Sequence, residues 1–411
     1  MSLGFPPALP VGRRRFAWRP GERKTIYLGA AVLGTALFFL IVCASSTWKD
    51  YRGQTADHPA PFGDFLALWS YAKVLAQFPA TELYRSEALH LHQVAWGMNP
   101  AWWNPFPYPP LVMPLVRGFD ILPYTASYMA WVGGSLALLL WVVFATSSRS
   151  VWGLAALVLA PATTMTIAGG QSGLLAAALM ILSLRLAWSR PVWAGLAVGV
   201  LACKPQLAVL LPIALAASGA WVTLLSAAAT SLGLGVLASL LYGWEIWPAW
   251  LAMLPGYNAK FVTETTLLRH QPTLAATLQA LGCPAGIATV GQLAAAALVA
   301  LTVWRLCRRM RGDVADAAVI VGTFVATPHA LVYDMPVVTV ALLLFIQHRL
   351  RRGEALATAE VALVSAAALL PVYMTLAAKA AWVPAAWPCL ALTFAMLARA
   401  AFRDAAARPQ R

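Results

Sequence analysis

The stretch that decides the topology of this chain is Trp193–Ala217, WAGLAVGVLACKPQLAVLLPIALAA. It is apolar and long enough to cross a membrane once, but Lys204-Pro205 interrupts it near the middle. Proline has no backbone N–H to donate, so a continuous helix loses a hydrogen bond there. We therefore predict two half-length helices that enter from the cytoplasmic side of a membrane and return to it.

The composition outside this stretch is that of a membrane protein. Of 411 residues, 61% are hydrophobic and 11% are charged, and the mean hydropathy is +0.71. As a helix, Ile26–Ser46 spans roughly 31 Å, about the thickness of one hydrocarbon core. We predict an all-α polytopic bundle of about 12 membrane segments in one membrane domain, residues 1–411. The other predicted spans are Leu122–Thr146, Val151–Ala168, Ser172–Trp188, Trp221–Leu241, Ala285–Trp304, Val314–Thr327, Leu331–Ile346, Ala355–Thr375 and Val383–Ala401.

The basic residues predict the orientation. The net charge is +14, but arginine and lysine cluster in short loops and at the termini, as orientation signals do. With a hairpin at Lys204-Pro205, both termini, including the basic segment 1–25, fall on the cytoplasmic side. A single full span there would instead place Arg305–Arg311 outside. No basic face is interleaved with aromatic residues, so nucleic acid is not an expected partner.

Two long loops are predicted on the outer side. The first, residues 47–121, contains amphipathic pieces at Phe65–Gln77 and Ser86–Trp96, which we expect to lie along the membrane surface. The second, residues 242–272, carries three tryptophans of the kind that form an interfacial aromatic belt.

Polar residues from separate loops converge on this outer side. They are Asp64, Gln171, Lys204, His329 and Asp334. Ionisable groups at membrane depth are costly and usually face a cavity or a partner. Asp64, in an aromatic setting, is the candidate catalytic base, and its alternative role is to cap the helix that begins at Phe65. Lys204 beside a helix break suits a phosphate contact, although it can also snorkel to the surface.

The other candidates also have two interpretations each. His329 after Pro328 is either functional or a capping and packing residue. Gln171 after two glycines contacts substrate or belongs to an ordinary tight turn. Asp334 is a further substrate-side candidate, although acids there are more often structural. Tyr108, in a Tyr-Pro-Pro-Leu corner, either lines a substrate groove or only stiffens the chain.

Several short motifs occur in an order that resembles a known family. They are Gly63-Asp64-Phe65 with Trp69 and Ala72, Leu83-Tyr84, Tyr108-Pro109-Pro110-Leu111, Gly169-Gly170-Gln171-Ser172, Ala194-Gly195-Leu196-Ala197, Lys204-Pro205-Gln206 and Thr327-Pro328-His329. In this ordered set the chain resembles glycosyltransferase family 87, the polyprenol-phosphate-mannose-dependent alpha-mannosyltransferases of the GT-C class. Ser172 departs from the asparagine that commonly follows this glutamine in the family.

The resemblance implies an enzyme of the bacterial inner (cytoplasmic) membrane with an extracytoplasmic active site. Asp64 then matches the catalytic base, and Lys204 and His329 match positions near the donor phosphate. Gln171, Tyr108 and Asp334 are the remaining substrate-binding candidates. The expected reaction is an inverting transfer of a hexose from a polyprenyl-phosphate donor to a lipid or glycan acceptor within membrane lipids. No DxD-like pair adjoins Asp64, so neither a metal nor another cofactor is expected.

Three other functions remain open at this point. A lipid-linked sugar flippase or transporter would use Lys204 and Asp334 for coupling and would need a polar path to the cytoplasm. A non-catalytic subunit of an envelope-polysaccharide assembly complex would tolerate asparagine at position 64. A lipid-linked oligosaccharide ligase would need more basic residues on the outer face.

Overall fold

A computed structural model describes residues 64–147, 150–263, 265–380 and 382–407, together with Leu37 and Ile41. All regular secondary structure in these residues is helical. The predicted first helix, Ile26–Ser46, and the basic segment 1–25 lie outside the described residues except for those two positions. The prediction of about 12 segments is therefore not tested in full.

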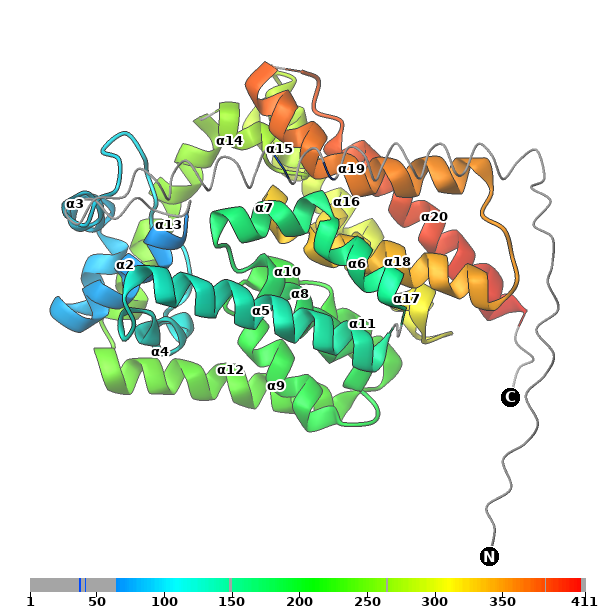
Figure 1. Ribbon diagram of the computed structural model, residues 1–411, viewed down its shortest axis with the longest axis horizontal. Helices are drawn as coiled ribbons and strands as arrows, with labels where there is room; N and C mark the ends of the chain where they lie inside the picture. Colours follow the sequence, from blue (N-terminus) through cyan, green and yellow to red (C-terminus); the bar gives the residue numbers. More distant parts are fainter. Residues whose placement is uncertain are drawn as a thin grey trace, which may run out of the picture.

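The helices fall into a first-loop group and a main bundle (Figure 1). The first-loop group is α2 (Phe65–Gln77), η1 (Ala80–Tyr84), α3 (Ser86–Ala95), η2 (Pro110–Val112), α4 (Met113–Val116) and η3 (Arg117–Asp120). The bundle consists of α5 (Tyr124–Thr146), α6 (Val151–Leu159), α7 (Pro161–Gly169), α8 (Gly173–Leu186), α9 (Pro191–Leu201), α10 (Pro205–Ala208), α11 (Leu211–Ser218), α12 (Trp221–Tyr242), α13 (Ile246–Thr263), α14 (Thr265–Arg269), α15 (Leu274–Ala280), α16 (Ala285–Cys307), α17 (Asp313–Ala326), η4 (Val332–Asp334), α18 (Pro336–Arg351), α19 (Thr358–Ala380) and α20 (Ala386–Ala406).

Four described helices are long and apolar enough to cross a membrane, namely α5, α12, α16 and α19. The pair α6 and α7 provides a fifth span if it is counted as one, with a bend of 54° between its halves. The bend lies at Ala160-Pro161, where Ala160 is extended (φ −60°, ψ 137°) and Pro161 has no N–H. The predicted span Val151–Ala168 is therefore a broken one.

The hairpin predicted at Lys204-Pro205 is present. Lys204 is non-helical (φ −121°, ψ 74°), and it separates α9 from α10 and α11. The two ends of the segment lie together, because the Thr223 hydroxyl at the start of α12 donates to the Ala187 carbonyl at the end of α8 (2.9 Å). A Cβ on Gly219 would also lie 3.9 Å from the Trp188 ring. The chain thus leaves and returns at the same end of the bundle.

The second predicted loop differs from expectation, because most of residues 242–272 is helical. The helix α13 covers Ile246–Thr263 and includes Pro255. Only one of its neighbouring tryptophans, Trp244, is strongly exposed. Trp247 and Trp250 instead turn inward, where their indole N–H groups donate to the Ser239 hydroxyl (2.8 Å) and the Pro107 carbonyl (3.3 Å). The helices α2 and α3 of the first loop begin and end within one residue of their predicted bounds.

Basic loops gather at the end of the bundle that lies opposite α2, α3 and α4 (Figure 1). Arg351 donates to Asp313 (2.8 Å) and to the Ser147 carbonyl (3.0 Å), and Arg185 also pairs with Asp313 (2.7 Å). These contacts join the loops that follow α5, α8, α16 and α18, which are loops predicted on one side of the membrane. We call this the basic end of the bundle.

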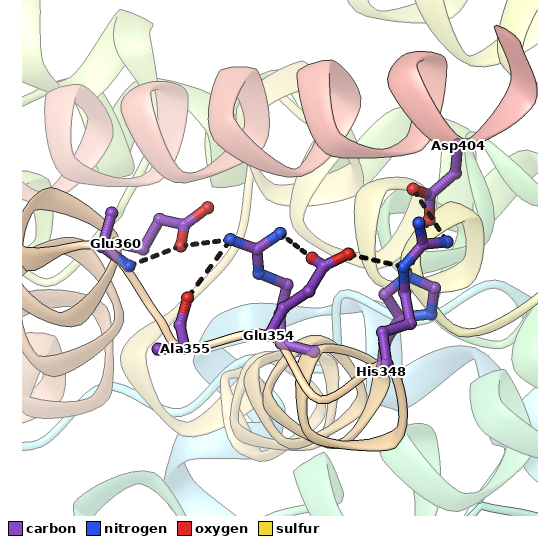
Figure 2. A network of polar contacts seen from close by, with 8 residues as sticks. His348, Glu354, Ala355, Glu360 and Asp404 are labelled. Carbon is purple, nitrogen blue, oxygen red and sulfur yellow. Dashed lines mark hydrogen bonds and ion pairs between the residues drawn. The ribbon is translucent and has the colours of Figure 1, made fainter. Parts of the chain in front are cut away.

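A second ionic network at the basic end ties α18 to α19 and α20, as Figure 2 shows. Arg349 pairs with Glu354 and, at 3.1 Å, with Glu360, while His348 pairs with Asp404 at 2.6 Å. The acidic residues of this end are therefore occupied by neighbouring basic side chains.

Small residues allow α9 and α12 to pack closely. A Cβ on Gly195 would lie 2.3 Å from Ser226 Cβ and 2.6 Å from the Thr223 carbonyl oxygen, and Gly199 is equally crowded by Thr230. Without a hydrophobic driving force between helices in lipid, such close approach is a main source of association.

We predict that Gly195→Ala lowers the free energy of unfolding by about 1–3 kcal/mol, because the added methyl group overpacks the α9–α12 contact. Gly233→Ala in α12 is the matched control, because no atom lies within 4 Å of its added Cβ. Thermal unfolding in detergent compares the two variants. Equal stability of both would contradict close packing at Gly195.

Candidate functional site

The turn between α7 and α8 is held against α2 and α5. Gly170 adopts φ +64°, and a Cβ there would lie 2.5 Å from Phe65 Cβ, so only glycine fits the turn at this distance. Helix α5 fixes the same turn, since Tyr128 donates to the Ile167 carbonyl (2.6 Å) and Trp131 to the Gly170 carbonyl (3.0 Å). The next residue, Gln171, consequently points at the start of α2.

Gln171 and Asp64 form the central contact of the site. The Gln171 amide Nε2 donates to Asp64 Oδ2 at 2.5 Å, across 107 positions of sequence. Asp64 precedes α2 but makes no side-chain capping bond to it. Burial raises the pKa of Asp64, and the hydrogen bond from Gln171 opposes that rise. The carboxyl is thus directed away from its own helix and has the raised pKa that suits a general base.

A proline-rich, non-helical segment, residues 105–109, forms one wall of the site. Prolines supply no N–H, but the backbone carbonyls of this segment still need donors. Side chains from three helices supply them: Tyr71 donates to the Pro105 carbonyl (2.6 Å), and Tyr84 to the Tyr108 carbonyl (2.9 Å). From α13, the Trp250 indole N–H donates to the Pro107 carbonyl. The rigid corner predicted at Tyr108 is therefore held in place from two separate parts of the chain.

Asp64 lines a cavity of about 590 Å³ that lies between the first loop and the bundle. This volume lies within the usual range of small-molecule sites. Its lining includes the polar side chains of Asp64, Gln171 and Tyr71, together with Trp102, Trp103, Tyr257, Lys260 and His270.

Lys204 and Asp334 form a buried ion pair beside this cavity. Lys204 Nζ lies 2.7 Å from Asp334 Oδ1, and the two side chains are 8% and 3% exposed. The other carboxylate oxygen of Asp334 accepts from the Leu331 N–H (3.1 Å). The ring of Tyr333, which lines the cavity, lies 5.3 Å from Lys204 Nζ. Lys204 is therefore anchored by Asp334, and the ammonium retains two further N–H groups.

A small apolar pocket of about 100 Å³ adjoins the cavity. Leu68 and Tyr108 line both spaces, and Lys204 lies on the wall of the pocket. The remaining lining is almost entirely apolar and comes from the first loop, α5, α8 and α9: Val112, Leu115, Val116, Phe119, Trp131, Leu175, Ala176, Leu179, Val200, Leu201 and Cys203, with Ser172.

His329 reaches the cavity through a neighbour. Its Nδ1 lies 3.0 Å from the Gln271 side-chain oxygen, and its Nε2 lies 3.3 Å from the Tyr257 hydroxyl. Burial lowers the pKa of His329 to about 4, so the ring is neutral at pH 7. Nδ1 then carries the proton, because an amide oxygen only accepts, and Nε2 accepts from Tyr257. A direct contact of His329 with phosphate stays a prediction.

The structure brings Asp64, Gln171, Tyr108, Lys204, and Asp334 together around one cavity and its side pocket. Sequence reasoning did not single out Lys260, Tyr257 and Trp103, which also line the cavity. Lys260 Nζ lies 4.1 Å from the Trp103 ring centroid, and Trp103 stacks against Tyr257 at 5.8 Å. The available signal was that Lys260 is one of the few basic residues on the predicted outer side.

We predict that Lys204→Met destabilises the protein by about 3–5 kcal/mol, because Asp334 would stay buried without its partner. The double variant Lys204→Met, Asp334→Asn removes both charges and should recover most of that loss. Unfolding measured for the wild type, both single variants and the double variant completes the cycle. Additive effects would show that the two charges are not coupled.

Comparison with known proteins identifies a family. A sequence model described as Glycosyltransferase family 87 matches residues 106–332, more than half of the chain. The match includes Tyr108, Gln171, Lys204 and His329, while Asp64 precedes it. No curated protein and no solved structure matches. The chain therefore belongs to glycosyltransferase family 87.

Proposed function

We propose that this glycosyltransferase moves a hexosyl group from a polyprenyl-phosphate donor to an acceptor hydroxyl, with Asp64 as the general base. The observation that carries the proposal is the Asp64 carboxyl, hydrogen-bonded by Gln171 at 2.5 Å and facing a cavity of about 590 Å³. The family resemblance favours mannose as the sugar.

The two joined spaces suit the two halves of such a donor. The larger cavity has room for a sugar, and its tryptophan and tyrosine rings offer faces on which a sugar ring stacks. The apolar pocket suits the first units of a prenyl chain, whose remainder would stay in lipid. The phosphate would then lie near Tyr108 and Lys204, where the two spaces meet. Lys260 offers a second cation on the cavity wall.

The proposed step is a single displacement at the anomeric carbon. The acceptor oxygen forms the new glycosidic bond while the bond from the anomeric carbon to the phosphate oxygen breaks. The acceptor proton passes to the Asp64 carboxylate. Negative charge grows on the departing polyprenyl phosphate, where charge-assisted hydrogen bonds from Lys204 stabilise it. Attack from the face opposite the phosphate inverts the anomeric configuration.

We further propose that the site opens on the extracytoplasmic side of a bacterial inner membrane. The basic end of the bundle lies opposite the first-loop helices, and basic loops favour the cytoplasm. The acceptor, a lipid or a glycan, would then approach from outside.

We predict that Asp64→Asn lowers turnover by about 100- to 10,000-fold, because asparagine cannot accept the proton. The assay measures release of polyprenyl phosphate by purified protein in lipid nanodiscs, with a panel of polyprenyl-phosphate sugars and membrane-lipid acceptors. Asp120→Asn is the control, since Asp120 belongs to the same loop and pairs with Arg117. Undiminished turnover by a folded Asp64→Asn variant would remove Asp64 from the mechanism. Bound lipid-linked sugar without turnover in the wild type would favour a flippase.

The hydrogen bond to Asp64 leads to a prediction about pH. The base works when ionised, so activity is present above the Asp64 pKa and lost as the pH falls through it. Gln171→Ala removes a donor that favours the ionised carboxylate, so the pKa rises further. The acidic limb of the rate profile should therefore move to higher pH, whereas Asp120→Asn should leave it in place. A shift to lower pH, or none, would refute the assigned role of Gln171.

A further inference from the structure

Three arginines after α16 stand apart from the ionic networks of the basic end. Arg308, Arg309 and Arg311 are exposed, and within the described residues no carboxylate lies within 4 Å of their guanidinium nitrogens. Within the described residues, Arg309 and Arg311 contact aromatic rings, and Arg311 also donates to a backbone carbonyl. Arg309 lies 6.0 Å from the Phe402 ring centroid, and Arg311 lies 3.4 Å from that of Trp188.

The nearby acids are already neutralised by other basic residues. Arg185 lies between Asp313 and Asp316, at 2.7 and 3.1 Å, and Arg351 also pairs with Asp313. Farther along the same end, three more acids pair with residues of α18: Glu354, Glu360 and Asp404. In the part of the chain that the structure describes, the positive charge of the three arginines is thus not balanced by a carboxylate and is available to an anion.

Two adjoining hollows lie beside these arginines. One, of about 280 Å³, is lined by Arg308, Arg309 and Arg311. The other, of about 180 Å³, extends between α8, α11, α16 and α17. Both share Ser218, Cys307, Met310 and Arg311.

The smaller hollow has both apolar and charged side chains on its wall. Leu184, Ala214, Leu215 and Val319 line it together with Arg185 and Asp316, which pair with each other. Arg311 lines both hollows in a defined position, since it donates to the Ser218 carbonyl (3.0 Å) and covers Trp188. The combined space thus places three arginines next to several apolar side chains.

We propose that this space binds an anionic phospholipid from the leaflet at the basic end. Its phosphate would lie among Arg308, Arg309 and Arg311, and the upper part of an acyl chain would lie against Leu215 and Val319. Basic pockets between membrane helices recognise anionic head groups in this way. Arginines that serve only as orientation signals need neither a hollow nor unpaired charge.

Phosphatidylglycerol is the probe, and phosphatidylcholine with the same acyl chains is the zwitterionic control. Each is titrated into purified protein in uncharged detergent, and the rise in melting temperature gives an affinity. Phosphatidylglycerol should stabilise the wild type more strongly. Arg308→Gln with Arg309→Gln should weaken its binding by about 30-fold, from about 1 kcal/mol for each arginine.

Two further variants distinguish binding at this specific site from non-specific attraction to the positive charge of the basic end. Arg399→Gln with Arg403→Gln removes two exposed arginines from α20 and should leave the affinity unchanged. Ser218→Trp fills the shared part of the hollows without changing charge and should weaken binding.

Several results would overturn the proposal. Equal responses to both lipids, or equal losses in the two arginine pairs, would show that no specific site exists. Reproduction of the full effect by inorganic phosphate would show that a free anion, and not a lipid, is bound. Because the melting-temperature measurements do not depend on turnover, these outcomes are independent of the proposed glycosyl transfer.

Discussion

Close packing around the turn between α7 and α8 connects parts of the chain that are far apart in sequence. A Cβ on Gly170 would lie 2.5 Å from Phe65 Cβ, and one on Gly173 would lie 1.9 Å from the Tyr333 carbonyl oxygen. The start of α2 and the η4 segment therefore both pack against this one turn. Gln171, between the two glycines, is held where its amide meets Asp64. A dense interior leaves such a side chain little freedom to move.

The two aspartates near the cavity differ in their partners. Asp334 has a cationic partner, Lys204, at 2.7 Å, and is almost fully buried. Asp64 has a neutral one, the Gln171 amide, and burial raises its pKa. The two carboxyls are chemically identical, but one lies against a lysine ammonium and the other against a neutral amide. This difference in environment fits the separate roles proposed for them, Asp334 as the anchor of Lys204 and Asp64 as the base.

Local patterns predicted much of the fold and less of the site. Apolar length predicted the four described helices that are long enough to cross a membrane, and Lys204-Pro205 predicted the hairpin, because both signals are local. The helix α13 was missed, since its tryptophans and Pro255 are typical of an interfacial loop. The site residues were predicted singly but not their pairing, because such contacts join positions more than 100 apart. Lys260 belongs to no motif, and its position on the cavity wall depends on how α13 packs.

The cavity wall is assembled from residues that range from Asp64 to Tyr333. During synthesis, a ribosome adds about 5–20 residues per second, so the nascent chain waits tens of seconds between these two positions. Throughout that interval the first-loop helices lack the later residues that complete the cavity wall around the Asp64 carboxyl. The cavity is consequently completed only late in translation, and a chain interrupted before Tyr333 would lack part of that wall.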